Sequence, residues 1–283
     1  MAKEGRKIKS TPPMDLVGNY IMPDRDAASN YFIETFDIGE CEKYIKRKRE
    51  EGLKGFGMLH IFAAAYVRTI SQRPGINRFI RGQKRYARNG VEISMTIKKS
   101  LTLDAPETCI KVFADPADTA EDIYRKMNAL INDNKDEEAE NGMDAIVNVL
   151  KYIPGVFLKF TVWLLKLLDY FGLLPRALTK ESPFHASIFI TNMASLGIKP
   201  VFHHLYDFGT LPVFMGIGAK YEKNELDTDG NVVTKRCMDM SIVCDERICD
   251  GHYYASAFKY LRGIMKKPDV LDNPPEKVVE DMK

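Results

Sequence analysis

The chain has 283 residues, of which 45% are apolar, so it is long enough for one large domain or two small ones. Its 41 lysines and arginines nearly balance its 39 aspartates and glutamates, leaving a formal net charge of +2. This balance excludes a strong overall field that would draw the chain to nucleic acid or to a membrane. The first thirteen residues are basic and polar without an apolar run, so we expect no secretory signal.

The five cysteines predict reduced thiols in a cytoplasmic protein. Their number is odd, and no two of them form a C-x-x-C pair, unlike the cysteines of a disulfide framework. Cys237, Cys244 and Cys249 lie close in the sequence, but zinc sites usually need shorter paired spacings. We therefore expect small buried side chains on strands and no metal site.

The predicted elements begin after a flexible tail over residues 1–20. Residues 31–38 alternate apolar and polar side chains, which is typical of a half-buried strand. Residues 39–51 are highly charged and predict a solvated helix. Residues 57–71 are apolar nearly all round, so they predict a buried helix that ends before Pro74.

A hairpin is predicted next. Residues 79–86 and 91–102 have the composition of strands, and Asn89 and Gly90 between them are a strong hairpin signal. A basic run without an intervening acid overlaps this region, and we expect it to lie mainly in solvated loops. Its members are Arg68, Arg73, Arg78, Arg81, Lys84, Arg85 and Arg88.

A further strand over residues 108–114 precedes a helix that runs to about residue 132. Asp118 or Thr119 is placed to cap this helix, because their side chains accept hydrogen bonds from orphan amide groups. Residues 133–144 are acidic and polar and predict a loop.

Residues 152–175 form an apolar segment that must be tested as a membrane span. Lys159, Lys166 and Asp169 interrupt it, whereas a spanning helix needs about 20 predominantly apolar residues. On a helix, Lys159, Lys166 and Tyr170 would share a narrow polar stripe and leave a wide apolar face. Such a helix packs against protein, covers the entrance to a substrate site or lies on a membrane surface. The sequence leaves these three alternatives open.

The last third of the chain predicts strands over residues 186–193, 211–222 and 232–244, the last two joined by a turn that contains residues 227–230. A final helix follows Asp250 and Gly251 and ends before Pro268.

Residues 245–251 have the sequence D-E-R-I-C-D-G. This heptad resembles the D-H-R-x-x-D-G signature of acyltransferases in the chloramphenicol acetyltransferase and 2-oxo acid dehydrogenase acyltransferase (E2) superfamily. Upstream segments resemble four more landmarks of the same superfamily in the same order. They are R-P-G-I-N at 73–77, K-V-F-A-D at 111–115, F-I-T-N-M-A-S-L-G at 189–197 and the strand at 212–218.

The resemblance implies a single α/β domain over residues 1–283, a chloramphenicol acetyltransferase-like two-layer sandwich with a mixed sheet and flanking helices. Residues 136–180 are a helical insertion relative to the compact core of that superfamily. The resemblance also implies a homotrimer, or a multiple of trimers, with sites between subunits. No lipoyl-lysine motif is present, so an acyl carrier would act in trans.

The chemistry that the resemblance implies is acyl transfer between a coenzyme A thioester and a thiol or hydroxyl acceptor. Glu246 stands where the superfamily has its catalytic histidine. Thr191 matches a serine whose hydroxyl stabilises the oxyanion. Asp250 matches a structural aspartate that usually pairs with an arginine, for which Arg25 is our candidate; Asp250 also suits the cap of the final helix.

Glu246 makes the activity uncertain on chemical grounds. A glutamate carboxylate, with an ordinary pKa of about 4.3, is a weaker base than an imidazole, and general base catalysis typically contributes about 10²- to 10⁴-fold. His203, His204 and His252 are candidates for a relocated base. Three interpretations of Glu246 therefore stay open: an inactive scaffold for binding or assembly, an active enzyme with a relocated or carboxylate base, and altered chemistry. A further alternative for the whole protein is a membrane-surface acyltransferase, in which the helix over residues 152–175 guides a lipidic acceptor.

Overall fold

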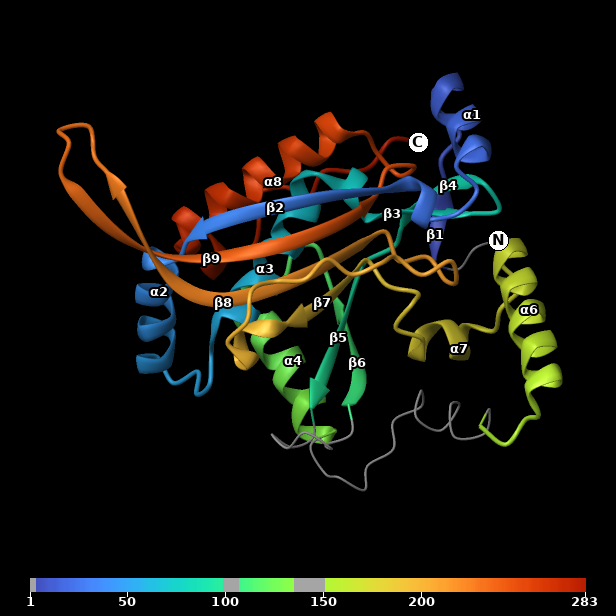
Figure 1. The fold of residues 1–283 in the computed structure, drawn as a ribbon, viewed down its shortest axis with the longest axis horizontal. Coiled ribbons are helices and arrows are strands. Elements are labelled where there is room, and N and C mark those ends of the chain that lie inside the picture. The colour runs from blue at the N-terminus through green and yellow to red at the C-terminus, as the bar shows by residue number, and fades with distance from the viewer. Residues whose placement is uncertain (1–3, 99–106, 135–150) are drawn as a thin grey trace.

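The computed structural model describes residues 4–98, 107–134 and 151–283, and a six-stranded mixed sheet runs through its centre (Figure 1). The strands are β2 (Ser29–Asp37), β5 (Val91–Lys98), β6 (Glu107–Ala114), β7 (Ile188–Asn192), β8 (Val213–Leu226) and β9 (Val232–Asp245). They lie in the order β2-β9-β8-β7-β5-β6. Strand β7 runs parallel to both of its neighbours, and the other pairs are antiparallel. The predicted α/β class with a mixed sheet is confirmed.

Four helices cover one face of this sheet (Figure 1): α2 (Gly39–Glu50), α3 (Met58–Gln72), α4 (Ala120–Asp133) and α8 (Gly251–Lys266). Twelve of the fifteen residues of α3 are buried, which confirms the prediction of a buried helix. Helix α2 was expected to be solvated, but it buries Cys41, Tyr44 and Ile45 against the core. Its apolar residues are few, yet they fall on one face, so a charged helix still contributes to the core.

The caps of α4 and α8 follow the sequence prediction. The Thr119 amide donates to Asp122 Oδ2 at 3.0 Å, and the Asp122 amide donates to Thr119 Oγ1 at 3.2 Å, which together form a capping box. Asp250 Oδ1 accepts a hydrogen bond of 2.8 Å from the Tyr253 amide at the start of α8. These polar side chains satisfy amide groups that a helix leaves without partners.

The predicted hairpin at Asn89 and Gly90 is wrong. A second sheet has the order β1-β4-β3, made of β1 (Gly5–Lys7), β3 (Arg78–Arg81) and β4 (Lys84–Arg88). The hairpin turn lies at Gly82 and Gln83, whose φ angles of 55° and 56° suit a tight two-residue turn. Gly90 instead leads from β4 in the small sheet to β5 in the large one.

The basic run was expected in solvated loops, and for most of its members this is wrong. Arg78 forms an ion pair with Asp281 at 2.5 Å, Arg81 with Glu4 at 2.6 Å and Arg85 with Asp15 at 2.9 Å. The partners are distant in sequence, so no local window could show them. The members that are no more than 8% exposed are Arg68, Arg78, Arg81, Arg85 and Arg88.

Residues 1–20 were expected to be a flexible tail. Within them the structure forms β1, which pairs with β4, and most of α1 (Pro13–Ile21). The predicted strands of the last third are confirmed as β7, β8 and β9, and β8 and β9 extend beyond the sheet as a long hairpin (Figure 1). Short 3₁₀ helices occur at η1 (Asp26–Ala28), η2 (Pro74–Asn77), η3 (Met193–Leu196) and η4 (Pro268–Asp272).

The apolar segment forms α6 (Gly155–Phe171), followed by α7 (Arg176–Glu181), at the edge of the molecule away from the β8–β9 hairpin (Figure 1). In the described part of the chain, no helix is long and apolar enough to cross a membrane. The loop predicted at 133–144 lies mostly outside the described residues.

Candidate functional site

The loop between β9 and α8 carries the D-E-R-I-C-D-G heptad, and a buried ion-pair frame holds it. Arg247 donates from Nε to Asp245 Oδ1 and from Nη2 to Asp245 Oδ2, both at 2.8 Å. Arg25 approaches the same carboxylate, with Nε 3.9 Å from Oδ2. All three side chains are at least nine-tenths buried. Charges so far from water are tolerated only in well-paired geometry, so the frame fixes the path of the loop.

Glu246 lies in this fixed loop, but its side chain is exposed. Its amide donates to the Ala28 carbonyl at 2.8 Å, which ties the loop to η1. The backbone is therefore anchored on both sides of the residue, and the carboxylate faces solvent.

The predicted partnership of Arg25 with Asp250 is wrong. Arg25 pairs with Asp245, while Asp250 is exposed and caps α8. An exposed aspartate cannot compensate a buried guanidinium, whereas Asp245, only 1% exposed, can. The alternative role that the sequence gave Asp250, a helix cap, is confirmed.

Thr191 lies in β7, at the centre of the large sheet, and is only 8% exposed. Side chains alternate along a strand, so Thr191 shares a face with Phe189, which packs on the side away from the helices. Its neighbours across the sheet are Gly216 and then Ser241. A Cβ on Gly216 would stand only 2.9 Å from the Val201 carbonyl oxygen, so glycine lets the segment after β7 lie directly against this row.

One chain does not bring Thr191 and Glu246 together. Thr191 is in the row of Ser241, and Glu246 follows the end of β9, five residues after Ser241. A strand rises about 3.3 Å per residue, so the two side chains are separated by roughly 17 Å along the sheet. They could act on one substrate only if they came from different copies of the chain.

Two of the three candidate histidines lie on the face of Thr191. The His203 ring stacks on Phe214 with 4.4 Å between centroids, and burial is the main cause that lowers the pKa of His203 below its usual 6.5. Its Nε2 is buried and has no hydrogen-bond partner among the described residues. His204 is exposed beside Tyr206. His252 is exposed in the first turn of α8, on the helical side of the sheet.

Sequence reasoning missed a buried Ser–His–Asp chain. His185 Nε2 is 3.1 Å from Asp169 Oδ1 in α6, and Nδ1 is 2.8 Å from Ser182 Oγ. The other oxygen of Asp169 accepts from the Gly209 amide at 2.9 Å. His185 is fully buried, which lowers its pKa and keeps it from substrate. These hydrogen bonds therefore attach α6 to the segments that lead into β7 and β8, and only the fold could have indicated them.

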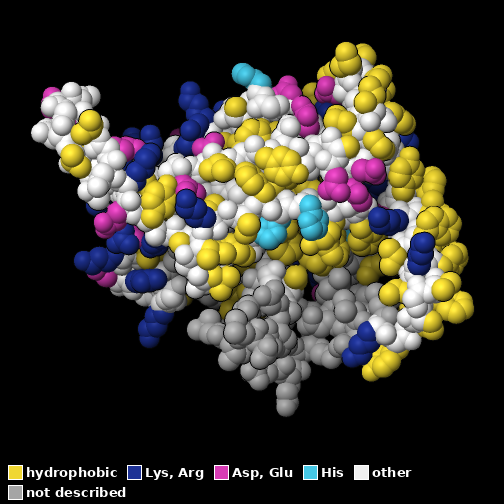
Figure 2. Space-filling view, in the orientation of Figure 1, with side chains coloured by type: hydrophobic (Ala, Val, Ile, Leu, Met, Phe, Trp, Pro, Cys, Tyr) yellow, Lys and Arg dark blue, Asp and Glu magenta, His cyan; other side chains and the backbone are white. Residues whose placement is uncertain are grey.

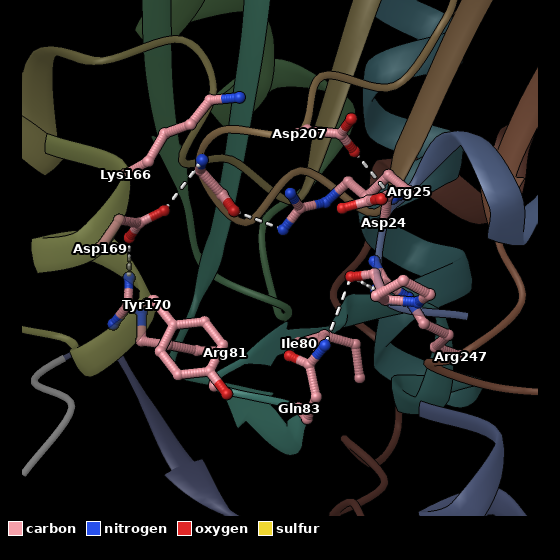
Figure 3. A pocket seen from close by; sticks show the side chains of 13 residues that line it. Asp24, Arg25, Ile80, Arg81, Gln83, Lys166, Asp169, Tyr170, Asp207 and Arg247 are labelled. Carbon is pink, nitrogen blue, oxygen red and sulfur yellow. Dashed lines mark hydrogen bonds and ion pairs between the residues drawn. The ribbon is translucent and has the colours of Figure 1, made fainter. Parts of the chain in front are cut away.

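A cavity of about 250 Å³ lies between the heptad loop and α6 (Figure 3). Arg25 and Arg247 reach it from the ion-pair frame, while Lys166, Asp169 and Tyr170 reach it from the insertion. Positive and negative groups alternate around its wall, so the cavity does not favour an anion by charge alone. Among the residues that the structure describes, no cluster of side chains is suited to a metal ion.

No protein-family model and no curated protein matches the sequence. Solved structures do match. A probable dihydrolipoamide acetyltransferase of Listeria monocytogenes is 12% identical with a TM-score of 0.58, covering 92% of this chain and 95% of that one. A chloramphenicol acetyltransferase is 10% identical with a TM-score of 0.57, covering 92% and 99%. The cubic core of a pyruvate dehydrogenase multienzyme complex is 14% identical with a TM-score of 0.53, covering 94% of each chain.

The chain has the chloramphenicol acetyltransferase-like fold. This confirms the resemblance that the heptad and its upstream landmarks indicated, at the level of the fold. Two of these matched structures are acetyltransferases by name, but a shared fold does not by itself assign an activity.

Proposed function

We propose that this protein transfers an acyl group between a coenzyme A thioester and a thiol or hydroxyl acceptor, with Glu246 as the group that accepts the proton. The observation that best supports this proposal is the contrast in burial within the heptad loop. Asp245, Arg247 and Arg25 are buried and rigidly paired, yet they hold an exposed carboxylate at the position of the superfamily's base. Positioning of this kind is what catalytic groups need.

In the proposed reaction, Glu246 takes the proton from the acceptor, whose sulfur or oxygen attacks the thioester carbonyl. A bond forms between the acceptor and the carbonyl carbon, and the carbonyl oxygen becomes an oxyanion. The Thr191 hydroxyl donates a hydrogen bond to that oxyanion. Collapse of the intermediate breaks the carbon–sulfur bond, and the protonated Glu246 returns its proton to the departing coenzyme A sulfur.

The proposal requires two copies of the chain, because Thr191 and Glu246 are far apart in one copy. An apolar surface suited to such an interface lies on the side of the sheet without helices, visible near the centre of Figure 2. We call it the open face, and it includes Tyr31, Ile33, Val201 and Phe202, all at least 42% exposed. The rings of Tyr31 and Phe202 meet edge to face at 5.4 Å, which joins β2 to the segment after β7. We propose a homotrimer assembled through this face.

The proposal includes coenzyme A as a substrate, no lipoyl-lysine on this chain, an acyl carrier in trans where the acceptor is a carrier thiol, and a cytoplasmic setting. Cys41, Cys237, Cys244 and Cys249 are buried and form no disulfide bond. Burial raises the pKa of Cys41 and Cys249 to about 12, so neither thiol competes as a nucleophile near neutral pH.

The test is turnover of acetyl-coenzyme A with thiol and hydroxyl acceptors. We expect Glu246→Gln to reduce turnover by about 10²-fold or more, because the proton acceptor is lost. Glu246→His should raise turnover by about tenfold or more, because an imidazole titrates near neutral pH. Asp26→Asn, which neutralises another exposed carboxylate near the loop, is the matched control and should leave turnover unchanged.

A second candidate base, His203, is favoured by its position on the face of Thr191 and by its lowered pKa. If His203→Gln removes turnover and Glu246→Gln does not, the base is His203; the assignment of Glu246 is then wrong, while acyl transfer itself stands. If calorimetry detects no binding of coenzyme A by the unmodified protein, the enzymatic proposal fails. The alternative of a catalytically silent binding or assembly protein then replaces it.

A further inference from the structure

Helices α1 and α6 expose apolar side chains that a soluble helix normally buries. In α6 only Asp169 is buried, and most of the aromatic and aliphatic side chains face solvent. Phe157 is 65% exposed, Trp163 55% and Phe171 64%, while in α1 Met14 is 79% and Ile21 73% exposed. Contiguous apolar surface of this extent indicates a docking site rather than scattered exposure.

The two helices belong to one side of the molecule (Figure 1). Both end against the turn between β3 and β4: Asn19 Nδ2 of α1 donates to the Gln83 carbonyl at 3.4 Å, and the Tyr170 carbonyl of α6 lies beside Gly82. Figure 2 shows hydrophobic side chains along this edge, from the upper corner down the side of the molecule. We call the exposed apolar side chains of α1 and α6 the edge surface; it is distinct from the open face of the sheet.

The exposed charges in the described part of the insertion are positive. Lys151, Lys159, Lys166 and Lys180 are exposed, and the acid that lies among them, Asp169, is buried against His185 and Arg81. An apolar surface with a basic fringe and amphipathic aromatic side chains is complementary to an anionic lipid headgroup layer over hydrocarbon.

A second copy of the chain fits this surface less well. A two-fold contact between α6 helices would pair two surfaces whose exposed charges are both positive, and no acid of α6 would compensate them, because Asp169 is buried. The seventeen residues of α6 extend about 26 Å, less than the hydrocarbon thickness, so on a bilayer this helix would lie along the surface and not cross it.

We propose that α1 and α6 together dock this protein onto an anionic membrane surface without crossing it. Asp169 fixes α6 to the sheet through His185, Gly209 and Arg81, so docking would set the orientation of the whole molecule. The cavity between α6 and the heptad loop would then lie close to the lipid (Figure 3). The inference does not depend on the proposed acyl transfer.

The chain carries one tryptophan, and it is Trp163 in the edge surface. The protein is mixed with vesicles of phosphatidylcholine alone, or with vesicles in which about a third of the lipid is phosphatidylglycerol. The second kind has an anionic surface of the kind that attracts lysines. We expect flotation with the anionic vesicles, a blue shift of Trp163 emission, and quenching by brominated lipid. Lys159→Gln together with Lys166→Gln should weaken binding about 30-fold, since each lysine contributes roughly fivefold near the surface.

Two matched controls separate docking from general effects. Lys46→Gln with Lys259→Gln removes the same charge from exposed positions on α2 and α8, and Leu226→Ser with Val232→Ser removes exposed apolar side chains from the β8–β9 hairpin. Both should bind as the unmodified protein does, whereas Phe157→Ser with Phe160→Ser should lose binding with unchanged circular dichroism. The proposal is overturned if the unmodified protein does not float with anionic vesicles, or if the control variants lose as much binding as the test variants. A blue shift of Trp163 emission that depends on protein concentration without vesicles would also overturn it and would assign the surface to a second copy.

Discussion

The charged residues of the heptad have different roles that the sequence alone does not show. Asp245 and Arg247 form the buried frame, Glu246 faces solvent, and Asp250 caps a helix. Asp245 and Asp250 are both acids of the heptad, and the resemblance predicted that Arg25 pairs with Asp250. Burial decides between them, because a guanidinium out of water needs a carboxylate that is equally buried.

Replacing each aspartate in turn should change the free energy of unfolding by different amounts. Asp245→Asn should lower the free energy of unfolding by about 3–5 kcal/mol, because it leaves Arg247 and Arg25 buried without their charge partner. Asp250→Ala should cost only about 1 kcal/mol, the usual effect of losing a helix cap. Urea unfolding followed by circular dichroism measures both. Equal costs for the two variants would show that Asp245 is not the central member of the frame.

At the element scale, α3 is held at its start by a histidine that must stay neutral. His60 Nδ1 accepts from the Gly57 amide at 3.1 Å, and its ring packs between Phe56 and Tyr124, joining α3 to α4. Burial lowers the pKa of His60 from 6.5 to about 4. In the unfolded chain the same imidazole becomes charged as the pH falls below 6.5. The unfolded state therefore binds more protons between pH 6.5 and 4, and stability rises with pH in that window.

We expect the free energy of unfolding to fall by up to about 3 kcal/mol through His60 as the pH is lowered from 6.5 to 4. His60→Gln should reduce this slope without removing it, since the pKa of His185 is lowered too. The pKa of Glu4 is lowered to about 2, and Arg81 beside it is the main cause that favours its charge over the opposing effect of burial. Its contribution is lost only below pH 4.5, in a separate window. Urea titrations at pH 7, 5 and 4 test this, and an unchanged slope in His60→Gln would contradict it.

At the scale of the whole molecule, the proposed site exists only in an assembly. Thr191 and the heptad loop lie in different parts of one chain, and the open face exposes the apolar surface that an assembly would cover. The edge surface of α1 and α6 lies elsewhere, so assembly and membrane docking need not compete.

Mixing two inactive variants tests the shared site. If each site takes Thr191 from one chain and Glu246 from the next, Thr191→Ala and Glu246→Ala should each be inactive alone. Refolded together in equal amounts as random trimers, they should regain about a quarter of the unmodified activity, because one site in four then has both groups intact. Recovery should depend on refolding together, not on simple mixing. No recovery from co-refolded trimers would mean that both groups act within one chain or that neither is catalytic.

Most of the elements after residue 20, and their order, could be predicted from the sequence. Periodicity found the strands and helices, Thr119 and Asp250 marked helix starts, and the heptad with its upstream landmarks identified the fold, because all of these depend on neighbouring residues. The sequence prediction wrongly placed a hairpin at Asn89 and Gly90, whereas the hairpin turn lies at Gly82. Composition cannot tell which two strands pair with each other.

Which charged residues are buried, and which apolar residues are exposed, depends on the tertiary fold. The partners of Arg25, Arg81 and His185 come from segments far away in the chain, and their pairing depends on burial that no local pattern encodes. The same holds for α6. Its sequence allowed a helix packed in the core, and the fold leaves it on the surface, because Asp169 rather than its apolar face makes the attachment. The heptad thus predicted the fold, while the separation of Thr191 from Glu246 could be learned only from the sheet.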